Sequence, residues 1–285
     1  MVLIEYLLRL PRRVSVALLP YLSILNLQRR LEMRLLNRWL EDLGGYRVLD
    51  VGCGHGLYTL KLAWAGASLV GIDVSEEALS LAQRMTSKVG FDKGSAYVVG
   101  SATELPARDR SFDVIVCNSV LEHITADELA LREMRRVLKA NGFLFLTVDC
   151  DERGLALSWV ERLPRWTRRL LLKAPVASAY TFREGLLGYL DDRYRVVHRY
   201  SAEALRSRLE RLGFQVVNRS YYLVGLGGAI YEATNAFRGL DMERGLGRIV
   251  YMFVSVVTYP LVLLGEGGGA KGHGLALLAV KKARK

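Results

Sequence analysis

The hydrophobic pattern between residues 46 and 150 alternates between two periods. Short apolar runs typical of buried strands lie at residues 46–51, 68–72, 96–99, 112–117 and 143–148. Between these runs, apolar residues recur every three or four positions, which predicts helices at residues 57–65, 76–88 and 126–139. A regular succession of strand and helix is typical of a parallel sheet covered by helices.

Capping and turn residues mark the expected ends of these elements. Ser75 can cap the second helix and Thr125 the third, because a hydroxyl oxygen can accept a hydrogen bond from a free amide at a helix start. Asn141 and Gly142 predict a turn into the fifth strand. Ser201 can cap one more helix after this region.

The rest of the chain predicts completion of the sheet. A helix from Ser201 is ended by Gly213, and the β-type residues 214–223 and 275–280 are expected to pair. Two segments interrupt this scheme, and together with the N-terminal residues we expect them to form a cap over the sheet. The expected units are an N-terminal helical cap at 1–45, a core at 46–150, a helical cap insertion at 151–200, and sheet completion at 201–285 with an apolar insertion at 225–272.

The composition is that of a folded chain with reduced cysteines. The 285 residues are 51% hydrophobic, enough for a substantial core. Cys53, Cys117 and Cys150 are odd in number and far apart, with no Cys-x-x-Cys pair, so neither a disulfide framework nor a metal site is expected. A cytoplasmic location fits best. The charged N-terminus is interpreted as mature protein, not as a signal peptide.

The positive charge is unevenly distributed. The formal net charge is +11, yet residues 46–150 hold 11 Lys and Arg against 13 Asp and Glu. The excess therefore belongs to the peripheral segments. This pattern indicates an anionic partner, such as a phospholipid surface, a phosphorylated substrate or RNA.

A glycine-rich turn connects the first strand to the first helix. Glycines let a backbone approach a ligand closely, and the free amides of a helix start suit a carboxylate or phosphate. A dinucleotide-binding fingerprint would need glycine where Leu57 stands. The candidate binding residues of this turn are Asp50, Gly52, Cys53, Gly54 and Gly56.

The second strand ends in a carboxylate, Asp73, followed by Val74. An acid at this position can accept hydrogen bonds from both hydroxyls of a ribose. It can also be a simple helix-start charge ahead of Ser75. Together with the glycine turn, Asp73 predicts a nucleoside-containing ligand.

Four further ordered motifs carry a family resemblance. They are Gly-Ser-Ala-Thr-Glu-Leu-Pro at 100–106, Ser-Phe-Asp-Val-Ile at 111–115, Leu-Glu-His-Ile at 121–124 and Arg-Glu-Met-Arg-Arg-Val-Leu-Lys at 132–139. Residues 46–148 thus resemble the class I S-adenosylmethionine-dependent methyltransferases of the ubiquinone/menaquinone type (methyltransferase type 11). The resemblance implies a doubly wound, Rossmann-like α/β fold, with a seven-stranded, mostly parallel sheet, an antiparallel last strand and helical cap insertions.

The resemblance also implies S-adenosylmethionine as cofactor and assigns residues to it. The glycine turn would hold the methionine moiety and Asp73 the ribose. The further implied cofactor contacts are Val74, which follows Asp73, Ser101 and Ala102 at the adenine edge, and Asn118 and Ser119 near the sulfonium. Two positions depart from the family, which commonly has an acid at 101 and Pro-Gly-Gly at 140–142.

His123 is the best candidate for a catalytic base, since neutral imidazole can remove a proton near pH 7. Methyl transfer does not require one, because alignment of the reactants alone can contribute about 7 to 11 kcal/mol. His123 can equally be a packing residue at a helix start. Asp149, Asp151, Tyr180 and Tyr200 are weaker candidates.

The expected acceptor is a small or amphiphilic molecule such as a quinone, polyprenyl or glycolipid intermediate. Residues 249–265 are uncharged but shorter than the roughly 20 residues of a bilayer span, so they are a lid, a membrane-surface helix or an interface. The basic, Trp-containing residues 159–173 also suit a membrane surface. We therefore expect possible peripheral attachment at the inner face of the membrane.

Two other functions stay open at this point. An RNA methyltransferase would also use the positive charge, but no RNA-binding module is recognisable. By resemblance, amino-methylating enzymes carry an Asn/Asp-Pro-Pro-Tyr/Phe motif after strand four, where this chain has Cys-Asn-Ser-Val at 117–120. Nucleic acid is therefore disfavoured as the acceptor. A non-catalytic cofactor-binding module is the other alternative. The sequence leaves the oligomeric state open.

Overall fold

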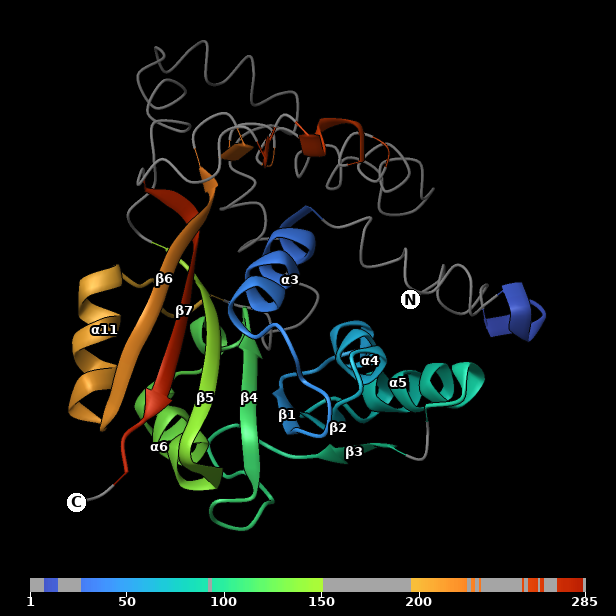
Figure 1. The fold of residues 1–285 in the computed structure, drawn as a ribbon, viewed down its shortest axis with the longest axis horizontal. Coiled ribbons are helices and arrows are strands. Elements are labelled where there is room, and N and C mark those ends of the chain that lie inside the picture. Colours follow the sequence, from blue (N-terminus) through green and yellow to red (C-terminus); the bar gives the residue numbers. More distant parts are fainter. Residues whose placement is uncertain are drawn as a thin grey trace.

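A seven-stranded sheet forms the centre of the molecule (Figure 1). The computed structural model describes residues 8–14, 27–91, 94–150, 196–224, 227–228, 231, 253, 256–260, 262–263 and 271–283. The strands are β1 (Arg47–Val51), β2 (Ser68–Asp73), β3 (Ser95–Val99), β4 (Phe112–Asn118), β5 (Leu138–Asp149), β6 (Phe214–Val224) and β7 (Gly272–Lys281). Their order is β3-β2-β1-β4-β5-β7-β6.

The strand directions confirm the predicted topology. Strands β1 to β5 are mutually parallel, and β7 runs antiparallel to both neighbours, β5 and β6. The chain proceeds outward from β1 to β3 and then returns to β4 on the other side of β1. Ligands of open α/β sheets bind at this switch point, outside the carboxyl ends of the strands.

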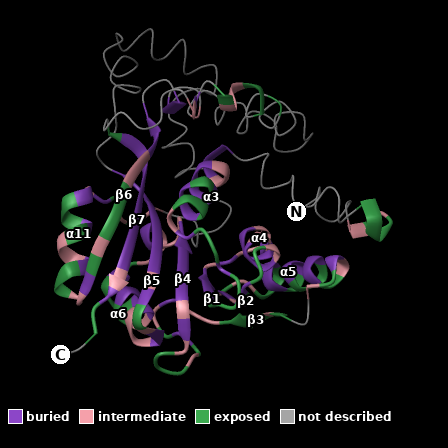
Figure 2. Ribbon diagram, viewed as in Figure 1, coloured by how far each residue is buried: buried purple, intermediate pink, exposed green. Residues whose placement is uncertain are grey.

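Helices cover both faces of the sheet. They are α3 (Leu27–Trp39), α4 (Leu57–Trp64), α5 (Glu76–Val89), η3 (Leu121–His123), α6 (Asp127–Val137) and α11 (Ala202–Arg211). Helices α3 and α4 share one apolar cluster with the sheet, α5 packs on α4, and α6 and α11 share the opposite cluster. The central strands are consequently buried, while the outer helix faces are exposed (Figure 2).

The predicted serine caps are confirmed, whereas the threonine cap is wrong. The hydroxyl oxygens of Ser75 and Ser201 each accept a hydrogen bond, at 3.2 Å, from the amide three residues later. Thr125 does not cap α6, because the helix begins one residue later than that cap requires. Its N-cap is Ala126, which makes no side-chain capping bond.

The start of the fifth strand also differs from the prediction. Helix α6 ends at Val137 and β5 begins at once with Leu138, so Asn141 and Gly142 lie inside the strand instead of preceding it. Asn141 has a left-handed φ of 61°. The register of the β4–β5 pairing shifts at the same place, because Phe112 pairs with Leu138 whereas Val114 pairs with Phe143. The turn signal therefore marks an irregularity within a longer strand.

The cap is described only in part. Residues 151–195 and most of 225–270 lie outside the described residues, as do Asp151, Tyr180 and the basic segment 159–173. Helix α3 represents the N-terminal cap, and it packs across the sheet beside β6 and β7. Within the described residues, no helix is long and apolar enough to cross a membrane.

Candidate active site

The glycine turn after β1 needs glycine for its backbone shape. Gly52, Gly54 and Gly56 have φ values of 70°, 52° and 71°, a left-handed region that side chains disfavour. The amides of Gly52 and Cys53 both donate to the carbonyl of Ile72, at 2.7 and 3.0 Å, which ties the turn to β2. The turn is therefore preformed at the switch point of the sheet.

Asp73 is oriented by this turn. Its Oδ2 accepts a hydrogen bond from the amide of Gly54 at 2.8 Å, and its Oδ1 accepts one from the amide of Ser75 at 2.9 Å. A carboxylate offers about four acceptor positions, so both oxygens retain capacity for the two hydroxyls of a ribose. Beside it, the apolar side chain of Val74 is 55% exposed, as expected if a ligand ring covers it.

Asp50 and Cys53 are buried within the support of the turn. Burial raises the pKa of Asp50 to about 7, although a hydrogen bond from the Thr59 hydroxyl and the charge of Arg29 oppose the shift. Burial also raises the pKa of the Cys53 thiol, whose sulfur faces Gly71 of β2. Burial therefore favours the neutral form of both side chains.

The loop after β3 is brought next to Asp73. The amide of Gly100 donates to the Asp73 carbonyl at 3.0 Å. The Ser101 hydroxyl is hydrogen-bonded to that of Thr103 at 2.7 Å, and Ala102 is buried. An adenine edge could contact this loop, although Ser101 already has an internal partner.

The turn after β4 is held in an unusual conformation. Ser119 has a left-handed φ of 51°, and its amide donates to the Thr147 carbonyl of β5 at 3.0 Å. Such strain persists only where the surroundings enforce it, and it is typical of functional sites. The buried side-chain Nδ2 of Asn118 meets no hydrogen-bond partner among the described residues. This orphaned donor lies at the same end of the sheet as the glycine turn.

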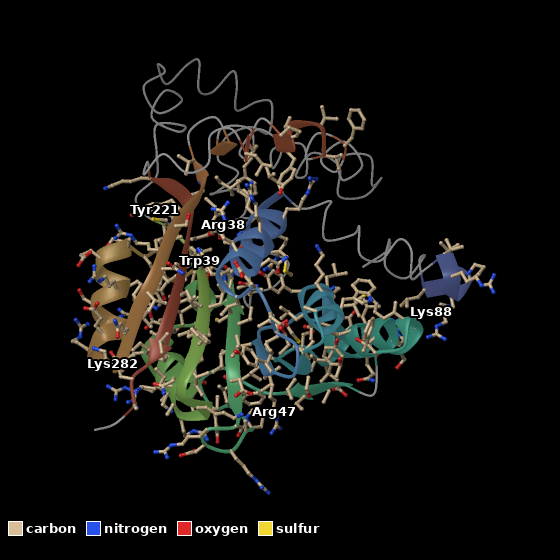
Figure 3. All side chains as sticks on the ribbon, viewed as in Figure 1. Arg38, Trp39, Arg47, Lys88, Tyr221 and Lys282 are labelled. Carbon is tan, nitrogen blue, oxygen red and sulfur yellow. The ribbon has the colours of Figure 1, made fainter. Side chains whose placement is uncertain are left out.

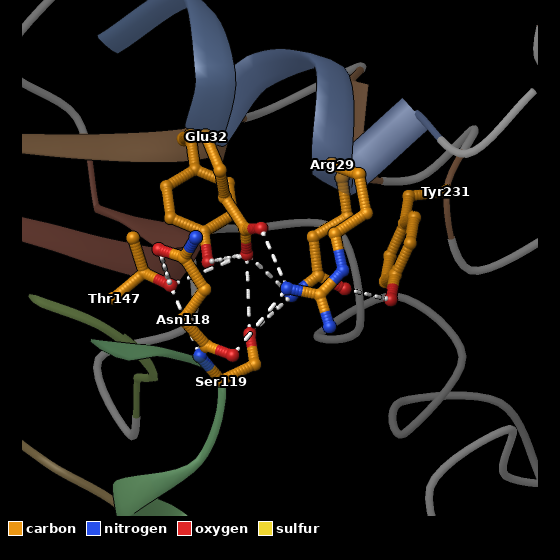
Figure 4. A network of polar contacts seen from close by, with 8 residues as sticks. Arg29, Glu32, Asn118, Ser119, Thr147 and Tyr231 are labelled. Carbon is orange, nitrogen blue, oxygen red and sulfur yellow. Dashed lines mark hydrogen bonds and ion pairs between the residues drawn. The ribbon is translucent and has the colours of Figure 1, made fainter. Parts of the chain in front are cut away.

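Helix α3 contributes a polar network that the sequence analysis missed (Figure 4). The Glu32 side chain is fully buried, and its Oε2 accepts from Arg29 at 3.2 Å. Its Oε1 accepts from Gln28 at 3.0 Å, Ser119 at 3.1 Å, Thr147 at 3.3 Å and Tyr222 at 3.0 Å. A signal was present in the sequence, because Glu32 interrupts the apolar face formed by Leu31, Leu35 and Leu36.

The candidate base and its weaker alternatives occupy different surroundings. His123 is partly buried at the end of η3, four residues after Ser119. Tyr200 is a structural residue, since its hydroxyl donates to the Asp127 carboxylate at 2.7 Å and links the start of α6 to the segment before α11. Asp149 is buried at the end of β5 and lines a small cavity with Gln28 and other polar residues. Among the described residues, no group of three or more His, Cys, Asp or Glu could hold a metal ion.

Comparison with known proteins agrees with this geometry. The methyltransferase domain family matches residues 49–146. A ubiquinone biosynthesis O-methyltransferase of Pseudomonas aeruginosa is 34% identical over 162 residues, which is 52% of this chain and 68% of that protein. The enzyme of the same name from Xanthomonas oryzae pv. oryzae is 39% identical over 123 residues, covering 42% and 50% of the two chains.

Solved structures share the fold at lower identity. A putative sarcosine dimethylglycine methyltransferase from Galdieria sulphuraria superposes with a TM-score of 0.59 at 16% identity, covering 89% of this chain and 86% of that one. Phosphoethanolamine N-methyltransferase 2 of Haemonchus contortus, solved with S-adenosyl-L-methionine, gives 0.57 at 18% identity, covering 89% and 53%. The [4+2]-cyclase SpnF gives 0.58 at 23%, covering 90% and 81%, so the fold alone does not define the reaction.

The chain belongs to the class I S-adenosylmethionine-dependent methyltransferases of the methyltransferase type 11 family. It is a methyltransferase whose cofactor is S-adenosylmethionine, as the motifs predicted. The geometry fits this cofactor, because a left-handed glycine turn, an oriented carboxylate at the end of β2 and a buried amide without a partner converge at the switch point.

Proposed function

We propose that this methyltransferase transfers the methyl group to a hydroxyl oxygen of a small, amphiphilic acceptor, of the quinone, polyprenyl or glycolipid kind, at the surface of the membrane. The similarity to the two ubiquinone biosynthesis O-methyltransferases supports methyl transfer to oxygen and the proposed class of acceptor. The position of α3 over the end of β4 supports an acceptor side at the Asn118–Ser119 turn. An exposed apolar surface supports the membrane part.

In this proposal each group of residues has one task. The glycine turn holds the methionine moiety, Asp73 binds the ribose hydroxyls, and the loop at Ser101 and Ala102 borders the adenine. The bound cofactor supplies an electrophilic methyl group on a sulfonium. The acceptor oxygen forms a bond to that carbon while the carbon–sulfur bond breaks and its electron pair stays on sulfur. The 118–119 turn aligns the two reactants, and such alignment can lower the barrier by about 7 to 11 kcal/mol.

The proton of the acceptor hydroxyl must be removed during this reaction. His123 remains the proposed base, because it follows the 118–119 turn closely in the chain and imidazole can accept a proton near pH 7. If it has this role, His123→Ala should lower the turnover number and leave cofactor affinity unchanged. Turnover equal to the unsubstituted protein would assign His123 to packing.

Cofactor binding is tested by calorimetry with S-adenosylmethionine. Asp73→Asn keeps the shape of the side chain but removes its charge, and we expect at least about tenfold weaker binding, since hydrogen bonds to charged groups contribute about 1.5–3 kcal/mol each. Glu203→Gln, an exposed first-turn acid of α11, is the matched control and should bind normally. Equal affinity in both variants would contradict the role of Asp73.

The acceptor is tested with methyl-labelled cofactor and hydroxylated quinone precursors of different tail lengths. The proposal expects label in an ether methyl group, with a lower KM for the longer apolar tails. Incorporation into amino groups, or into RNA but no hydroxylated lipid, would overturn the acceptor class. An absence of incorporation with normal cofactor binding would overturn the proposed acceptor class and leave the methyltransferase assignment intact.

The proposed membrane surface is an apolar stripe beside basic residues of α3. Phe253, Val256 and Val257 are 68%, 44% and 56% exposed, and their spacing with the exposed Pro260 is that of one helix face. On the opposite face, Val262 is fully buried. An exposed apolar stripe of this kind is typical of a helix lying in a lipid interface.

One arginine of α3 contacts the segment that carries this stripe. Arg30 lies 4.1 Å over the ring of Tyr259, so α3 and the apolar segment are in contact. Arg30, Arg34 and Arg38 follow at intervals of four residues along one side of α3, and the latter two are exposed. Figure 3 shows Arg38 on α3, next to Trp39. We propose that these arginines and the apolar stripe together bind anionic lipid headgroups, which attract basic residues near a membrane surface.

Vesicle flotation tests this surface. We expect the protein to float with phosphatidylglycerol vesicles at low salt and Val257→Glu to float several-fold less. Leu129→Glu on α6, where the leucine is 48% exposed, is the matched control and should float as the unsubstituted protein does. Equal loss in both variants, or no flotation of the unsubstituted protein, would overturn the membrane part while leaving the methyltransferase assignment intact.

A further inference from the structure

The Glu32 network is more elaborate than support of a helix requires. An isolated buried carboxylate is strongly destabilising unless charges and hydrogen bonds compensate it. Five groups from α3, the 118–119 turn, β5 and β6 donate to Glu32, which makes it the central acceptor of the network in Figure 4. An apolar residue at this position could pack α3 without that cost, so the carboxylate points to a specific task.

The network acts on the strained turn after β4. The Ser119 hydroxyl donates to Glu32 and accepts a hydrogen bond from Gln28 at 2.9 Å. Arg29, paired with Glu32, donates to the main-chain carbonyl of Asn118 at 3.3 Å. Three neighbouring residues of α3 are thus bonded to two consecutive residues that lie about 90 positions away in the sequence, at the carboxyl end of β4.

We infer that Glu32 is a positioning residue for methyl transfer. Through Ser119 and Arg29, its carboxylate holds the 118–119 turn in the left-handed conformation in which the turn borders the reacting groups. This inference rests on the proposed function, which places the acceptor side at that turn. It assigns to α3 a part in catalysis beyond covering the sheet.

The chemistry of the site makes such positioning important. An in-line displacement is sensitive to the alignment of its reactants, and a misplacement of about 1 Å can reduce the rate roughly 100-fold. A left-handed conformation is disfavoured for serine, so we expect the turn to relax when its restraints are removed. Without the Glu32 carboxylate, the Ser119 hydroxyl and the Arg29 guanidinium lose the partner that fixes them.

Glu32→Gln is the most informative substitution. It keeps the side-chain volume and one carbonyl oxygen for the hydroxyl donors, but its amide cannot pair with Arg29. We expect the turnover number to fall roughly 10- to 100-fold, and cofactor affinity to fall much less, because the glycine turn and Asp73 are untouched. Glu41→Gln, at an exposed acid just after α3, is the matched control and should change neither quantity.

Ser119→Ala completes a double-mutant cycle with Glu32→Gln. If Glu32 acts through Ser119, the two losses in turnover should not add in the double variant. Ser119→Ala also carries the test alone if Glu32→Gln does not fold, because it leaves the carboxylate in place. Normal turnover in Ser119→Ala, or additive losses in the cycle, would overturn the inference.

Amide hydrogen exchange separates this inference from the proposed function. In Glu32→Gln, residues 118–121 should exchange faster, whereas the glycine turn at 52–56 should exchange as in the Glu41→Gln control. This result does not depend on knowing the acceptor. Unchanged exchange at 118–121 in Glu32→Gln would overturn the inference. If exchange at 118–121 rises as expected but the unsubstituted protein methylates none of the proposed acceptors, only the proposed function is contradicted.

Discussion

Two glycines of the same turn are expected to respond differently to alanine: Gly52→Ala should mainly lower stability, and Gly54→Ala should mainly weaken cofactor binding. A Cβ on Gly52 would lie 2.3 Å from one methyl carbon of Val120 and 2.8 Å from the other, whereas a Cβ on Gly54 would meet nothing within 4 Å. Both residues have left-handed φ values, 70° and 52°. Gly52 is therefore constrained by packing and conformation together, and Gly54 by conformation alone.

The magnitudes follow from these contacts. A left-handed alanine costs about 1–2 kcal/mol, and overpacking adds about 1–3 kcal/mol. Gly52→Ala should thus lower the free energy of unfolding by roughly 2–5 kcal/mol and Gly54→Ala by only about 1–2 kcal/mol. In the proposed site, however, the added methyl group of Gly54→Ala occupies space over the turn where the cofactor binds. It should weaken S-adenosylmethionine binding at least about tenfold.

Urea unfolding and calorimetry together measure both effects. A double variant, Gly52→Ala with Val120→Ala, provides the control, because it removes the clashing methyl groups and should recover the overpacking part, about 1–3 kcal/mol. Equal destabilisation by Gly52→Ala and Gly54→Ala would refute this reasoning. So would a double variant whose losses are simply additive.

Three further substitutions test the supports of the fold. Because burial raises the pKa of Asp50 to about 7, the folded state keeps a proton that the unfolded chain releases above about pH 4, so this group makes stability fall from about pH 4 to 7. Asp50→Asn should flatten that fall and raise the free energy of unfolding at pH 8 by at most roughly 4 kcal/mol; an unchanged pH profile of urea unfolding would contradict the shift. Tyr200→Phe removes a hydrogen bond to the Asp127 carboxylate and should cost about 1.5–3 kcal/mol, with unfolding unaffected only if that bond does not form. Ser75→Ala should cost about 1 kcal/mol through loss of the α5 cap, and Ser75→Thr, which keeps the hydroxyl, should cost less.

Local patterns in the sequence were sufficient for most of the fold. Strand and helix periods, the two serine caps and the glycine turn depend on neighbouring residues, and the structure agrees with them within a few positions. Errors arose where a distant element decides the outcome. Leu138 joins β5 because it pairs with Phe112 of β4, and no local signal shows that pairing.

The sequence also predicted that the candidate cofactor residues lie together, because they follow the ends of neighbouring parallel strands. Asp73 and Gly54 were both predicted binding residues, although their mutual hydrogen bond comes from the pairing of β1 and β2. The sequence pattern predicted the same role for all glycines of the turn. Only packing against Val120 separates Gly52 from Gly54.

The Glu32 network required the tertiary structure. Glu32 and Ser119 lie 87 positions apart, and Glu32 and Tyr222 lie 190 apart, so no spacing rule connects them. A buried glutamate within an apolar helix face is visible in the sequence as an exception, but its partners are not. They are decided by how α3 crosses the sheet, because a carboxylate removed from water must find its donors on whichever elements fold around it.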